Sequence, residues 1–181
     1  VDPVIPILRF DSLDGDPVAI LVSYACHPVV LAADNLLLTG DYVHFVREEL
    51  EAALPGAVAI FATGCAGDIN SGHSAQSSLS AQGNADRSYE MAAHIGSGIA
   101  KAVMNCDLSA LDHRCGVAED RIDLDFLSRE AASADMLIDQ WTNLAHGDAD
   151  KAFIYEIWID WARNRMTTDI EPLEVRCTAL Y

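Results

Sequence analysis

Apolar and polar positions along this chain follow two different periods, which predict alternating strands and helices. Runs that are continuously apolar, or that alternate strictly with polar residues, are typical of strands. They occupy residues 4–10, 18–26, 57–62, 114–124 and 173–180. The turn at 13–16 contains Asp14-Gly15, a pair that favours a tight hairpin between the first two runs. The sequence therefore predicts an N-terminal hairpin and three later strands.

Apolar residues at helical spacing predict four helices between and after these strands. They cover residues 41–54, a segment that includes 92–103, and then 127–144 and 152–166. Asp41 is a candidate N-cap for the first helix, and Pro55-Gly56 is its expected stop. The second helix has small residues on its apolar face, so we expect it to pack closely on the sheet.

This order of elements predicts an α/β fold with a mixed sheet, because the opening hairpin is antiparallel, and with helices flanking that sheet. A chain of 181 residues, 51% of them hydrophobic, can bury a sizeable core. No repeat or linker divides the chain, so we expect one domain over 1–181. Because it starts at Val1 without a methionine and ends in a strand-like run, we expect a segment of a larger domain, incomplete at both ends.

Charge and cysteine content narrow the classes of function. A net charge of −17, from 28 acidic residues against 11 lysines and arginines, would repel nucleic acid, so we exclude a nucleic-acid partner. No apolar stretch approaches the roughly 20 residues that span a bilayer, so no transmembrane segment is expected. The five cysteines have no C-x-x-C spacing, which argues against disulfides and a cysteine-rich zinc site. Unpaired cysteines favour a reducing compartment such as the cytoplasm.

Two of the predicted strands end in polar loops that carry candidate chemistry. His27 follows the strand at 18–26, and Pro28 directly after it blocks further pairing in a central strand. The strand at 57–62 ends in the loop 63–70, T-G-C-A-G-D-I-N. Open α/β sheets bind ligands outside the carboxyl ends of their strands, so we expect the two loops to converge. From position alone, His27 could also be a structural histidine satisfied by a backbone carbonyl.

The same residues carry a resemblance to a known family. The sequence is similar to the neutral/alkaline non-lysosomal ceramidases in a series of segments: Asp2-Pro3, 8–11, 22–28, Asn35, Gly40-Asp41 and 61–70. The similarity is most specific in the first 70 residues and continues more loosely over most of the chain. It implies that the chain is the central part of a ceramidase-like catalytic domain.

The resemblance implies a zinc-dependent hydrolase that splits an N-acyl amide into an amine and a carboxylic acid. It makes His27 a ligand of Zn²⁺, which lowers the pKa of a bound water to about 7 and polarises the amide carbonyl. The family's other ligands lie outside the segments present in this sequence. We therefore expect them from missing residues or from a second polypeptide. Ceramidases carry a serine where this chain has Asn70, so the substrate need not be ceramide.

The loop after the second strand supplies the remaining catalytic candidates. We expect Gly67, Asp68 and Asn70 to hold the substrate or the oxyanion that develops on it, partly through backbone N–H groups. The alternative is a tight turn in which glycine permits positive φ and Asp68 binds backbone amides. The two roles are compatible.

Three more residues, Asn35, Ser71 and His73, are expected to contact the substrate. Asn35 could instead form an Asx turn, and His73 could be a solvated loop residue. A competing hypothesis treats the whole chain as a non-catalytic binding or assembly module on the same scaffold. It predicts that the protein binds no metal and hydrolyses no amide.

Overall fold

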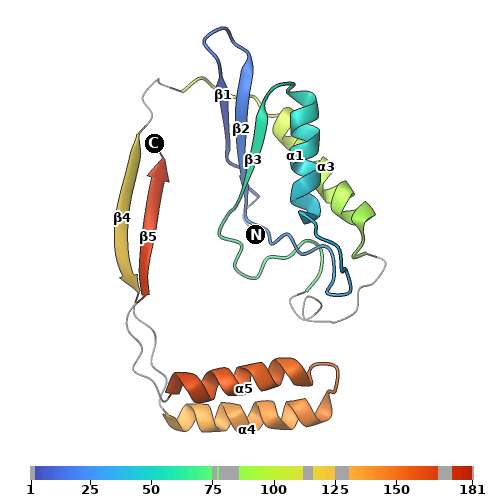
Figure 1. The fold of residues 1–181 in the computed structure, drawn as a ribbon, viewed down its shortest axis with the longest axis vertical. Coiled ribbons are helices and arrows are strands. Elements are labelled where there is room, and N and C mark those ends of the chain that lie inside the picture. Colours follow the sequence, from blue (N-terminus) through green and yellow to red (C-terminus); the bar gives the residue numbers. More distant parts are fainter. Residues whose placement is uncertain are drawn as a thin grey trace. The chain divides into compact units, whose positions relative to one another are not determined.

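The computed structural model describes residues 3–74, 77, 86–111, 116–124, 131–166 and 173–180. By its internal contacts the chain divides into two compact units, Val1–Leu108 and Ser109–Tyr181, which are described separately below (Figure 1). Both units combine helices and strands, which confirms the predicted α/β class. That the chain forms one domain stays a prediction.

The first unit is built on a three-stranded sheet in the order β1-β2-β3 (Figure 1). Strand β1 (Ile7–Asp11) pairs antiparallel with β2 (Pro17–Tyr24), and β2 pairs parallel with β3 (Val58–Thr63). The hairpin turns at Gly15, whose φ of 90° lies in the region that favours glycine. The predicted hairpin and the mixed character of the sheet are therefore confirmed.

Helix α1 (Asp41–Ala53) packs against β3 and supplies the centre of the core. Its buried residues Tyr42, Val46 and Leu50 follow one another at intervals of four, so they form a single apolar stripe. The chain leaves the helix through Pro55 and Gly56, and the φ of Gly56 is 93°. The predicted helix and its stop signal are confirmed.

The start of α1 differs from the prediction that Asp41 is the N-cap. Gly40 stands in the N-cap position without a side-chain hydrogen bond, and Asp41 is the first residue of the helix. The Asp41 carboxylate accepts a hydrogen bond from Tyr42 N–H at 2.8 Å and two more from the amides of Val30 and Leu31. The prediction was wrong because these partners lie ten and eleven residues earlier, outside any local capping pattern.

Helix α3 (Tyr89–Met104) begins after the N-cap Ser88, whose side chain accepts a hydrogen bond from Met91 N–H. Its small residues lie against α1, and not against the sheet as predicted. A Cβ added to Gly96 would be 2.6 Å from Phe45 Cβ on α1. A small-residue face indicates a close approach, but it does not identify the element that approaches.

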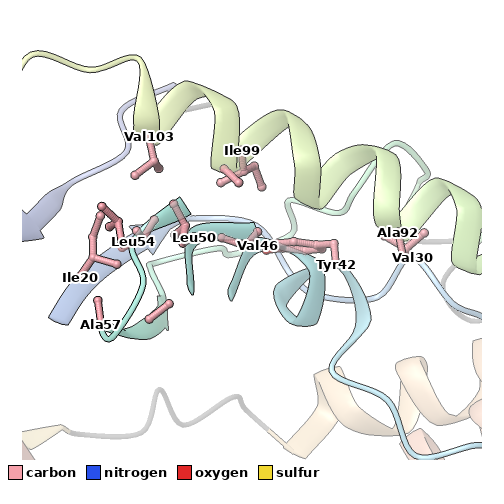
Figure 2. Packing of buried hydrophobic residues seen from close by; sticks show 13 residues of the cluster. Ile20, Val30, Tyr42, Val46, Leu50, Leu54, Ala57, Ala92, Ile99 and Val103 are labelled. Carbon is pink, nitrogen blue, oxygen red and sulfur yellow. The ribbon is translucent and has the colours of Figure 1, made fainter. Parts of the chain in front are cut away.

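The core of the first unit joins the sheet and the two helices in one cluster of buried residues. Figure 2 shows Ile99 and Val103 of α3 beside Val46 and Leu50 of α1, with Ile20 of β2 in the same cluster. Helix α1 contacts both β3 and α3, so it is enclosed on two sides. The position of α1 therefore determines where the loop that precedes it can run.

The second unit consists of a two-stranded ribbon and a helical hairpin. Strands β4 (Val117–Leu124) and β5 (Leu173–Leu180) pair antiparallel with each other, and β4 is exposed along its whole length. Helices α4 (Ala131–Gly147) and α5 (Ala152–Met166) pack on each other, and the rings of Trp141 and Trp158 are in contact between them. Within α5, the Tyr155 ring lies edge-on to the Trp158 ring.

The predicted elements of the second unit are confirmed where they fall on described residues. The first residues of the strand predicted at 114–124 and of the helix predicted at 127–144 lie outside the described ranges. The predictions at 152–166 and 173–180 match α5 and β5. In the part of the chain that the structure describes, no helix is both long and apolar enough to cross a membrane.

The contact between α1 and α3 can be tested with two glycines of one helix. We predict that Gly96→Ala lowers the free energy of unfolding by about 1–3 kcal/mol, because the new Cβ would overlap Phe45 and the backbone oxygen of Tyr42. Gly98→Ala meets nothing within 4 Å, so its better helix propensity should raise stability by up to about 1 kcal/mol. Urea unfolding measures both variants, and equal changes would contradict the close approach.

Candidate functional site

Parallel pairing brings the ends of β2 and β3 to the same edge of the sheet. Their register ends at the pair Tyr24 and Thr63, and the next residue, Gly64, donates its N–H to the Tyr24 carbonyl at 3.0 Å. A Cβ added to Gly64 would lie 3.3 Å from Ala25, so the two chains run close together beyond the sheet. The loops that follow the two strands are therefore neighbours, as predicted.

His27 is held in the loop after β2 by contacts to the loop after β3. Its backbone N–H donates to the Ile69 carbonyl at 2.9 Å, and the residue forms an isolated parallel bridge with Asn70. The Nε2 atom of its half-buried ring lies 2.9 Å from the Gly67 carbonyl oxygen. A carbonyl oxygen only accepts, so Nε2 carries a proton in this contact, and in the tautomer with a single ring proton Nδ1 keeps its lone pair.

The loop from Gly64 to Gly72 makes a tight turn around Gly67, whose φ is 55°. The Ile69 N–H closes this turn by donating to the Ala66 carbonyl at 2.8 Å. Gly67 and Asp68 are exposed, and within the described ranges their backbone N–H groups find no acceptor. The expected turn is present, and these two N–H groups are available to a bound molecule.

Ser71, which follows Asn70, has an unusual hydroxyl group. Its Oγ atom is buried and makes no hydrogen bond to any described residue. Buried polar atoms in proteins are normally paired, so an exception needs an explanation such as a ligand or a water molecule. Among the residues predicted to contact the substrate, Ser71 therefore has the clearest physical signature.

The other two predicted substrate contacts have a different environment. The Asn35 side-chain amide donates to the Leu37 carbonyl at 2.9 Å, and its oxygen accepts from the Tyr89 hydroxyl at 3.1 Å. Asn35 Oδ1 also accepts from the Leu37 N–H at 3.4 Å, which is the hydrogen bond of the Asx-turn alternative. His73 is half-buried in the loop after Ser71. Substrate contact by Asn35 or His73 stays a prediction.

Behind His27, a buried tyrosine holds the backbone of the preceding residue. The Tyr42 hydroxyl donates to the Cys26 carbonyl at 2.7 Å, and the contact is buried. Burial raises the pKa of the Tyr42 hydroxyl well above its ordinary value of 10.0, and burial also raises the pKa of the Cys26 thiol above 9.0. Both groups therefore stay protonated over the neutral pH range.

Sequence reasoning did not assign Asp41 and Arg87 to the site. The Asp41 carboxylate accepts hydrogen bonds from backbone amides of residues 29–31, which follow Pro28. The Arg87 side chain donates hydrogen bonds to the backbone carbonyls of the same residues. Both residues are buried. The only sequence signal is that each charged residue precedes or begins a helix, and this signal is also typical of ordinary helix starts.

A metal site needs several side chains that can bind a metal close together. Within the described ranges, no three side chains of His, Cys, Asp or Glu lie close enough together to hold a metal ion. A catalytic zinc usually has about three protein ligands. His27 therefore stands alone as a predicted ligand in the described part of the chain.

Comparison with known proteins does not assign a family. No protein-family model matches the sequence, and no curated protein is significantly similar to it. The resemblance to the ceramidases is therefore carried by the sequence segments alone.

The hydrogen bond between Tyr42 and Cys26 yields a prediction for stability. Tyr42→Phe leaves a buried carbonyl without a partner and should lower the free energy of unfolding by about 1–3 kcal/mol. The control at pH 7 is Tyr24→Phe, because the Tyr24 hydroxyl makes no hydrogen bond to a described residue. Folding raises the pKa of the Tyr42 hydroxyl. The protonated hydroxyl therefore contributes fully to the free energy of unfolding below pH 10, and this contribution is lost as the pH rises further. Urea unfolding at pH 7 and above pH 10 should show a shallower alkaline loss in Tyr42→Phe than in the wild type.

The unpaired Ser71 hydroxyl yields a second prediction. Ser71→Ala should leave the free energy of unfolding unchanged or raise it slightly, because it removes a buried polar atom that has no hydrogen-bond partner among the described residues. The matched control is Ser88→Ala, which removes the N-cap of α3 and should cost about 1 kcal/mol. Thermal unfolding measures both variants. A loss of stability in Ser71→Ala as large as in the control would mean that this hydroxyl has a structural partner.

Proposed function

We propose that the protein is a ceramidase-like, zinc-dependent hydrolase of N-acyl amides in which His27 is a zinc ligand. The observation that carries the proposal is the hydrogen bond between His27 Nε2 and the Gly67 carbonyl. Histidines that bind metals almost always donate the other ring N–H to a carbonyl or a carboxylate, which orients the ring. His27 has this arrangement and keeps Nδ1 for a metal.

The proposal needs ligands in addition to His27. The described residues do not form a complete zinc site, so the proposal takes the remaining ligands from residues outside the described ranges or from a second chain. When bound, zinc would activate a water molecule and polarise the amide carbonyl of the substrate.

Residues of this chain bind the substrate and stabilise the charge that develops on it. The N–H groups of Gly67 and Asp68 donate to the oxygen of the amide as it becomes negative. Ser71 offers its unpaired hydroxyl to a polar group of the same substrate. Asn70, beside His27, fixes the orientation of the amide through its side chain.

Removal of His27 tests the metal assignment. In the protein isolated with any partner polypeptide, His27→Ala should abolish hydrolysis of N-acyl amides. It should also weaken zinc binding by more than about 100-fold, because loss of an outer partner alone costs roughly 10- to 100-fold. Native mass spectrometry reports both bound zinc and a second chain. The control is His94→Ala, which changes an exposed histidine on α3 and should leave zinc and activity unchanged.

The possible outcomes separate the hypotheses. Zinc retained by His27→Ala would remove His27 from the ligand set. A wild-type protein that binds no zinc and hydrolyses no amide, with all its chains present, would overturn the enzyme proposal in favour of the non-catalytic module. Zinc without hydrolysis of any N-acyl amide would overturn the substrate class alone.

A further inference from the structure

Two buried charges of opposite sign lie on either side of one short stretch of backbone, residues 29–31. Asp41 is 5% exposed and Arg87 is 9% exposed, and they are the buried charged residues of the described part of the chain. No ion pair between described residues joins them to each other. What lies between the two charges is the peptide backbone of this segment.

Two successive peptide groups are each held at both ends. In the first, the Val29 carbonyl accepts from Arg87 Nη2 at 3.2 Å and the Val30 N–H donates to Asp41 Oδ1 at 3.2 Å. In the second, the Val30 carbonyl accepts from Arg87 Nε at 3.2 Å and the Leu31 N–H donates to Asp41 Oδ2 at 2.9 Å. The Leu31 carbonyl accepts a further bond from Arg87 Nη2 at 3.0 Å.

This arrangement aligns peptide dipoles between a carboxylate and a guanidinium. The positive N–H end of each peptide faces Asp41, and the negative carbonyl end faces Arg87. Each peptide group carries a dipole of about 3.5 D, and its interaction with a buried charge is screened only weakly. Buried charges are tolerated in proteins when hydrogen bonds compensate them. The segment therefore has one favourable orientation.

The backbone conformation of Asp41 agrees with the same conclusion. Its φ of 52° is unfavourable for a residue with a side chain. Within the described ranges, the other residues with positive φ are glycines. Such conformations persist where the surrounding contacts over-determine them. Here Asp41 keeps this conformation while its carboxylate accepts from the amides of the segment 29–31.

The orientation of the segment is passed to His27 through a short and stiff connection. Pro28 fixes its own φ near −65°, and the Val29 N–H donates to the His27 carbonyl at 3.0 Å. We propose that Asp41 and Arg87 are positioning residues that act together through the segment 29–31 to hold the His27 ring on the Gly67 carbonyl. A catalytic role for this positioning of the His27 ring rests on the proposed function, but the positioning itself does not.

The test reads the His27 ring directly, without metal or substrate. In the ¹⁵N-labelled chain at pH 8, the Nε2–H proton of His27, assigned by its loss in His27→Gln, should give a visible signal that exchanges slowly with water. In Asp41→Asn, and in Arg87→Lys, which keeps the charge but loses the fork of donors, this exchange should become at least about 10-fold faster. Unchanged exchange in folded variants would overturn the proposal.

Two controls separate positioning from a general loss of stability. Ser97→Ala removes a hydrogen bond with Glu49 that joins α3 to α1 and does not touch the segment 29–31. This variant should leave the His27 signal unchanged. In the double variant Asp41→Asn/Arg87→Lys, exchange should be no faster than in the more affected single variant, because either change releases the same segment. If the fold-increases in exchange rate of the two single variants multiply in the double variant, the two residues act independently, and the joint role is overturned.

If the variants do not fold, amide exchange in the wild-type protein still tests the proposal. The amides of Val30 and Leu31 should exchange with solvent at least about 10-fold more slowly than those of Gly67 and Asp68, and equal exchange would overturn the proposal. None of these measurements depends on zinc. If the protein binds no zinc but the His27 Nε2–H proton exchanges slowly, only the proposed function is overturned. If this proton exchanges fast in the wild-type protein, only the positioning role is overturned.

Discussion

Parallel pairing of β2 with β3 is the constraint on which the rest of the first unit depends. It places the carboxyl ends of both strands at one edge, so that His27 and the loop around Gly67 become neighbours although 40 residues separate them. The register also decides which side chains enter the core. A slip of one residue would turn Ile20 and Val22 out of the cluster and would move His27 out of reach of Gly67.

The loop that connects β2 to α1 shows how irregular backbone can be made rigid next to a site. Its peptide groups cannot pair with a neighbouring strand, so they need other partners where they are buried. Asp41 and Arg87 supply these partners from the starts of the two helices that pack on each other. The contact between α1 and α3 is thereby connected to the segment that follows His27. Packing of the core and geometry of the site are not independent in this unit.

Much of this fold could be predicted from the sequence because its signals are local. Apolar periods, the turn at Gly15 and the stop at Gly56 marked the elements to within a few residues. Long-range partners could not be predicted in the same way. The Arg87 side chain binds carbonyls 56 to 58 residues away, and neither its charge nor its position before a helix indicates that. The packing of Gly96 on α1 was missed for the same reason.

At the site, the rule that ligand loops follow strand ends correctly brought His27 and residues 63–70 together. The alternative for His27, a structural histidine bound to a carbonyl, also describes the observed contact. The two descriptions do not compete, because an imidazole has two nitrogens with separate roles. The bond from Nε2 to Gly67 selects the tautomer in which Nδ1 keeps its lone pair. A structural contact at one nitrogen therefore leaves the lone pair of the other nitrogen without a proton.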